Sequence, residues 1–169
     1  MKQFIPYRSK ILLGLATLAF TVALGAGLAF ADNVQCKQNS PCSVTVNQDN
    51  GNLVVTYNIT GLGGTSVAGW AVDADVDGHA RCKNSGGNCP EAANKFGVTD
   101  LHVTGQFKVH NGNASGTITV TPQSGLDCPG NQQPIILDVS WTNITFTVEG
   151  VVLLNVQGPL NASPLAACS

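Results

Sequence analysis

Two hydrophobic patterns divide the chain into a short leader and a longer remainder. Residues 11–30 are almost continuously apolar, and three basic residues stand among the ten that precede them. Small residues close the run at Ala31. A basic start, an apolar middle and a small-residue end are typical of a secretory signal peptide. We therefore predict a helical leader over residues 1–31, cleaved after Ala31, and a single exported domain over residues 32–169.

Beyond the leader, short β-branched runs alternate with Gly, Asn and Pro every ten to fifteen residues, and no stretch shows an apolar period of 3.6. This pattern is typical of an all-β domain. Asn50-Gly51 and Asn111-Gly112 are pairs that favour tight hairpin turns. Strands are expected at residues 42–46, 53–59, 67–81, 99–108, 115–121, 135–149 and 151–156. Seven strands predict an antiparallel β-sandwich with an immunoglobulin-like outline, and a small β-barrel is the alternative.

Charge narrows the classes of partner. Cleavage removes three of the eight Lys and Arg residues, which leaves five against ten Asp and Glu, a net charge near −5 (5 minus 10). These five cations are scattered along the chain, whereas nucleic acids and anionic lipids attract clustered ones. We expect an extracellular partner that is not a nucleic acid. The apolar run is about 20 residues, enough to cross a bilayer, so the leader is the one expected membrane contact, before cleavage or as an uncleaved anchor.

All six cysteines lie in the exported part, and their even number predicts three disulfides. Zinc is the less favoured alternative because no C-x2-C pair occurs. If successive strands run antiparallel, Cys36 and Cys42 lie at one pole of the sandwich and the other four at the opposite pole. A disulfide requires Cα atoms within about 7 Å, so the two groups should not mix. The scheme predicts Cys36–Cys42, together with either Cys82–Cys128 and Cys89–Cys168, the first choice, or Cys82–Cys89 and Cys128–Cys168.

Several short motifs in residues 82–147 occur together in one group of proteins. They are Cys82-Lys83-Asn84-Ser85-Gly86-Gly87-Asn88, Ala92-Ala93-Asn94-Lys95, Asn111-Gly112 with Gly116, Cys128-Pro129-Gly130-Asn131-Gln132 and Val139-Ser140-Trp141-Thr142-Asn143-Ile144-Thr145. In these motifs the chain resembles a group of small secreted bacterial proteins that are β-rich, contain disulfides and have no known function. The resemblance implies export and fold, implies no activity, and favours the Cys82–Cys128 pair.

The sharpest candidate for chemistry is the run Asp73-Ala74-Asp75-Val76-Asp77-Gly78. It matches the opening of a calcium loop, in which hard oxygens converge from a short turn. The twelfth position of such a loop should be Glu, but here it is Asn84, and no helical pattern flanks the run. The alternative is a strand in which Val72, Ala74 and Val76 face inward. Its outward side chains are then Asp73, Asp75, Asp77, His79 and Arg81, an acidic face that could hold calcium weakly.

Histidine offers a second candidate metal site. If strands 67–81 and 99–108 are neighbours in one sheet, His79 and His102 are expected close together on the outer face, flanked by Asp77 and Asp100. Two imidazoles and two carboxylates can bind a transition metal. Two exposed histidines without a metal are the alternative.

Nothing in the sequence points to catalysis. There is no G-x-S-x-G motif, and paired cysteines are not nucleophiles. Trp70 and Trp141 are expected in the core. We therefore predict a secreted, non-catalytic surface, matrix or binding protein with no catalytic residue and no cofactor. The alternatives are a calcium- or metal-binding module that uses Asp73, Asp75 and Asp77, and a small secreted hydrolase.

Overall fold

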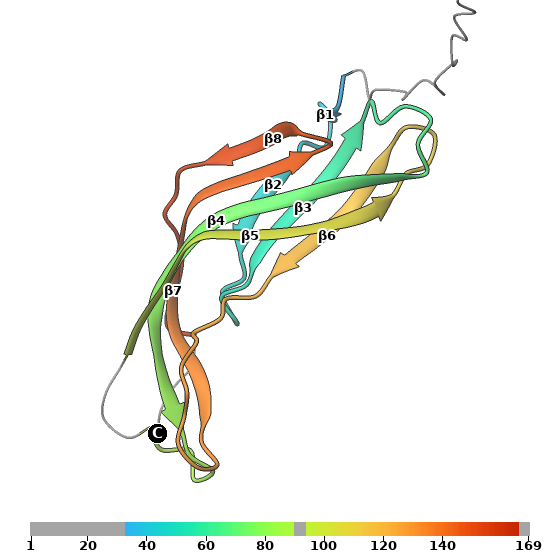
Figure 1. Cartoon of the computed structure of the whole chain (residues 1–169). Helices are drawn as coiled ribbons and strands as arrows, with labels where there is room; N and C mark the ends of the chain where they lie inside the picture. Colours follow the sequence, from blue (N-terminus) through green and yellow to red (C-terminus); the bar gives the residue numbers. More distant parts are fainter. Residues whose placement is uncertain (1–32, 90–93, 166–169) are drawn as a thin grey trace, which may run out of the picture.

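Nine β-strands form the described part of the chain in a computed structural model, which describes residues 33–89 and 94–165 (Figure 1). They are β1 (Gln35–Cys36), β2 (Ser43–Val46), β3 (Leu53–Thr60), β4 (Val67–Lys83), β5 (Asn94–Lys108), β6 (Ala114–Val120), β7 (Gln133–Val148), β8 (Val151–Val156) and β9 (Leu160–Ala162). The predicted leader over residues 1–31 lies outside the described residues. In the part that is described, no helix is long and apolar enough to cross a membrane.

The strands form two packed antiparallel sheets, as the sandwich prediction required. In the four-stranded sheet, β1 and β2 pair in succession along one edge of β3, and β6 pairs along the other. In the five-stranded sheet the order is β5-β4-β7-β8, and β9 shares with β8 the outer edge of β7. The described strands do not close into a barrel. Because β1 and β9 have two and three residues, they are too short to leave an alternating pattern in the sequence.

The core lies between the two sheets and follows the predicted alternation. In β4, Val72, Ala74 and Val76 are buried, and the intervening residues face outward. Of the two tryptophans that we expected in the core, Trp141 is completely buried, whereas Trp70 is half-buried and packs against the core. Their inward placement follows from strand parity, because alternate side chains of a strand point to opposite faces.

Strands β4 and β7 extend well beyond the smaller sheet. They have 17 and 16 residues, against 8 in β3 and 7 in β6. Figure 1 shows that β4, β5 and β7 curve together and continue as an arm below the sandwich. Strand β5 begins at Asn94, earlier than the expected residue 99, because it continues to pair with β4 along this arm.

One defined disulfide lies beside the short strands β1 and β2, and another lies at the end of the arm. Cys36–Cys42 and Cys82–Cys128 are both formed, each with a Cα–Cα distance of 5.5 Å. The alternative scheme, with Cys82–Cys89 and Cys128–Cys168, is therefore wrong. Cys89 is also disulfide-bonded, while its predicted partner Cys168 lies outside the described residues. Such bonds are consistent with an oxidising, extracellular-type environment.

Candidate functional site on the outer face of the five-stranded sheet

The acidic run occupies the outer face of the five-stranded sheet. Residues 73–83 belong to β4, which pairs with β5 on one side and β7 on the other. The interpretation as an EF-type calcium loop is therefore wrong, since the backbone is extended there and cannot wrap around an ion. The alternating strand explains the spacing instead: Asp73, Asp75 and Asp77 are two residues apart because they share one face.

The register of the sheet separates the two histidines that we expected side by side. β4 and β5 are indeed antiparallel neighbours, but His102 lies opposite Asp73, and His79 lies opposite Lys95. Six strand positions separate Asp73 from His79, a distance of about 20 Å at ~3.3 Å per residue. The expected pairing of His79 with His102 is therefore wrong. Asp100 does not lie beside Asp77 either, because Gly97 holds that register position.

Each histidine contacts one carboxylate instead. His102 Nδ1 lies 2.5 Å from Asp73 Oδ1, and the two side chains are 59% and 43% exposed. His79 Nδ1 lies 2.9 Å from Oδ1 and 3.1 Å from Oδ2 of Asp138, and the His79 backbone N–H also donates to Asp138 Oδ1. Sequence reasoning did not single out Asp138. Its outward position in β7 is the signal that could have found it, once β7 is known to adjoin β4.

Asp75 lies where the sheet changes register, between irregularities in the two strands that flank β4. The register shifts there against both β5 and β7, and Asp100 and Asn143 have positive φ angles of 55° and 51°. The Asp100 backbone N–H donates to Asp75 Oδ1 over 2.8 Å, and the Asn143 side-chain amide donates to Oδ2 over 2.7 Å. The Asn143 amide and then the Asp100 N–H lower the pKa of the Asp75 carboxyl below its ordinary value of 3.8.

The five residues predicted to bind metal are thus divided among separate positions. Asp73 contacts His102, Asp75 accepts two hydrogen bonds, His79 contacts Asp138, and Asp77 is exposed beside Gly97. Within residues 33–89 and 94–165, no three His, Cys, Asp or Glu side chains are grouped in a way that could hold a metal ion. A pair of groups offers fewer ligands than calcium or zinc takes from proteins.

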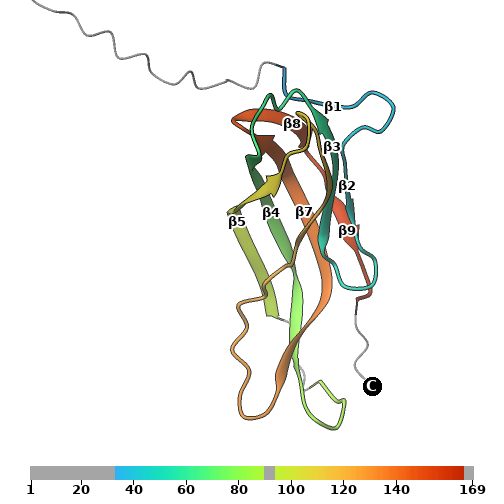
Figure 2. The ribbon, with the colours of Figure 1, turned by 90° about the vertical axis from the view of Figure 1, so that its right-hand side faces the viewer.

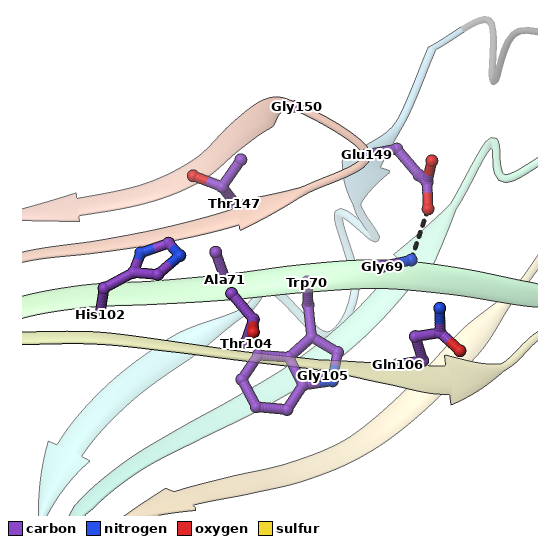
Figure 3. A pocket seen from close by; sticks show the side chains of 10 residues that line it. All are labelled: Gly69, Trp70, Ala71, His102, Thr104, Gly105, Gln106, Thr147, Glu149 and Gly150. Atoms are coloured by element: carbon purple, nitrogen blue, oxygen red, sulfur yellow. Dashed lines mark hydrogen bonds between the residues drawn. The ribbon is translucent and has the colours of Figure 1, made fainter.

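A shallow hollow lies on the same outer face, next to the Asp73–His102 pair. It encloses about 640 Å³ over strands β4, β5 and β7 (Figure 3). Small residues form its floor, namely Gly69, Ala71 and Gly105, and polar side chains surround them. These are His102, Thr104, Gln106, Thr147 and Glu149. The hollow exists because β4 presents only Gly69 and Ala71 outward there, while the neighbouring strands carry larger polar side chains.

One contact fixes a wall of the hollow, and a second supports its floor from the inner side of the sheet. The Glu149 carboxylate accepts a hydrogen bond from the Gly69 backbone N–H, which holds the β7–β8 turn against β4. On the inner side of the same strands, the indole of Trp70 lies across Gly105, where a Cβ atom would come within 2.4 Å of the ring (Figure 3). Sequence reasoning missed this hollow, because its floor depends on which small residues of β4 and β5 become neighbours.

The chemistry of the hollow is that of hydrogen bonding. Hydroxyl and amide groups can both donate and accept, and the Glu149 carboxylate accepts. No family model, curated protein or solved structure matches this chain. The resemblance to small secreted bacterial proteins therefore stays a prediction.

Proposed function

We propose that the protein is secreted and acts without catalysis as an extracellular binding protein. The observation that carries this proposal is the hollow on the outer face of the five-stranded sheet, with its floor of small residues and its polar walls. The leader pattern and the disulfides support export. A rigid sheet is well suited to hold such a surface in a fixed shape.

The polar groups indicate the kind of ligand. Thr104, Thr147 and Gln106 offer neutral donors and acceptors, whereas Glu149 and the nearby Asp73 disfavour anions. The best match is an uncharged ligand rich in hydroxyl or amide groups, which lies flat on the floor at Ala71. Because the hollow is shallow, a single protein molecule is expected to bind such a ligand weakly.

Titration of the ¹⁵N-labelled secreted protein with neutral oligosaccharides and short uncharged peptides tests this proposal. A ligand of the proposed kind shifts the amide signals of residues 69–71, 104–106 and 147–150. Ala71→Phe fills the floor and should abolish those shifts. Thr119→Phe is the matched control, because Thr119 is exposed on β6 of the other sheet. The proposal is wrong if no compound binds, if the shifts map elsewhere, or if Ala71→Phe binds as well as the control.

A further inference from the structure

Strand β5 is the longest open edge among the described strands. It ends its sheet, as Figure 2 shows, and it has 15 residues. The other edge strands are shorter: β6 has seven residues, β8 has six and β2 has four. Exposed edges are usually protected by proline, by lysine or by a bulge, because their unpaired backbone groups can bind another strand. From Leu101 to Phe107, β5 carries neither proline nor lysine, and its register shift against β4 lies before this segment, at Asp100.

The hydrogen bonds between β4 and β5 show which backbone N–H and C=O groups of β5 point away from β4. The Val109 N–H donates to Ser66 O over 2.9 Å, so the backbone of residue 109 faces β4. Successive residues of a strand face opposite neighbours, and the β4–β5 register is unbroken from Leu101 to Lys108. The N–H and C=O groups of His102, Thr104, Gln106 and Lys108 therefore point to the open edge.

We propose that β5 pairs with β5 of a second copy of this chain, antiparallel and centred on Thr104. In this register Thr104 lies opposite Thr104 of the second copy, and His102 lies opposite Gln106. His102, Thr104 and Gln106, whose backbones face the edge, then lie opposite one another, so each such pair exchanges two N–H···O bonds. The two sheets continue into one.

Charge selects this register over its neighbours. Centring on Thr104 brings the Asp100 side chain, at the register shift just before the regular segment, next to Lys108 of the second copy, and the symmetry repeats this pair at the other end. A register centred one residue earlier or later keeps the edge-facing backbone groups opposite one another. It places Lys108 opposite Val98 or His102 instead. Opposite charges across strands are favourable and like charges are not. The proposal does not depend on what the hollow binds, although it places two hollows side by side on one sheet.

Sedimentation equilibrium of the secreted protein tests the proposal with two variants. Thr104→Pro removes only the N–H that points away from β4, a position where an edge strand tolerates proline. Thr104→Ala, the control, keeps that N–H. We expect dimers for the wild type and Thr104→Ala, and monomers for Thr104→Pro. A wild type that stays monomeric at concentrations on the order of 1 mM overturns the proposal, as does a dimeric Thr104→Pro.

A second variant tests the register and does not depend on proline being tolerated. Lys108→Glu places like charges opposite Asp100 at both ends of the pairing, so we expect the dissociation constant to rise about fivefold or more at low salt. The difference should shrink at an ionic strength of ~1 M, where charges are screened. Lys83→Glu is the matched control, because Lys83 ends β4 opposite Gln133, far along the arm from the Leu101–Lys108 segment. Equal dissociation constants for the two variants overturn the proposed register.

Discussion

At the scale of single residues, Trp141 joins the two sheets through one polar contact. Its side chain is fully buried in β7, and its indole N–H donates to the Gly51 carbonyl over 2.9 Å. Gly51 has a φ of 73° in the turn before β3, and a Cβ atom there would lie 2.7 Å from a Val139 methyl group. The sequence predicts that Trp141 is buried, but a hydrogen bond that spans 90 residues could not be read from it.

Trp141→Phe should therefore destabilise the fold by about 2–3 kcal/mol, because it removes the donor for a buried carbonyl and leaves a small cavity. Urea unfolding measures this loss. Trp70→Phe is the matched control, and we expect it to cost about 1 kcal/mol, since Trp70 is only half-buried. Equal losses for the two variants would contradict the role assigned to the Gly51 contact.

At the scale of elements, strand β4 shows what a periodic sequence pattern can predict and what it cannot. The alternation of apolar and acidic residues predicts which side chains of β4 are buried, and the structure confirms this. It does not predict the register with β5 and β7, because Asp100 and Asn143 shift both neighbouring strands at Asp75. The candidate metal site depended on that register, which is why its residues could be named from the sequence but not grouped.

This separation predicts that calcium and zinc leave stability unchanged. At ~1 mM metal, a site with a dissociation constant above ~1 mM stabilises by less than about 0.4 kcal/mol, which changes Tm by roughly 2 °C at most. Thermal unfolding with each metal, and with a chelator as the control, measures the shift. A rise of several degrees that Asp73→Asn abolishes would contradict this expectation and restore the acidic face as a cation site.

At the scale of the whole molecule, the two defined disulfides act at opposite ends. Cys36–Cys42 fastens the chain beside the short strands β1 and β2, and Cys82–Cys128 fastens the end of the long arm. Their sequence separations are 6 and 46 residues. A bond that closes a longer loop removes more conformational freedom from the unfolded chain.

Replacing both cysteines of a pair by Ala should show that difference. The loop-entropy relation gives a loss of about 4 kcal/mol for Cys82→Ala with Cys128→Ala, and about 2 kcal/mol for Cys36→Ala with Cys42→Ala. Guanidinium unfolding of both variants, without reductant, measures the two losses. If the short loop costs as much as the long one, local packing rather than chain entropy governs the stability of these ends.

The sequence by itself determined the class of fold, the faces of the strands and the Cys36–Cys42 pair, because period-two alternation and chain direction are local properties, whereas the structure decided between the two schemes left open for Cys82. Only the tertiary structure decided the strand register, its shift at Asp75 and the neighbours of each functional side chain. These depend on contacts between strands far apart in the chain, and a single shifted residue moves them. The hollow over Ala71 is such a case, since its floor forms only where residues from β4 and β5 adjoin.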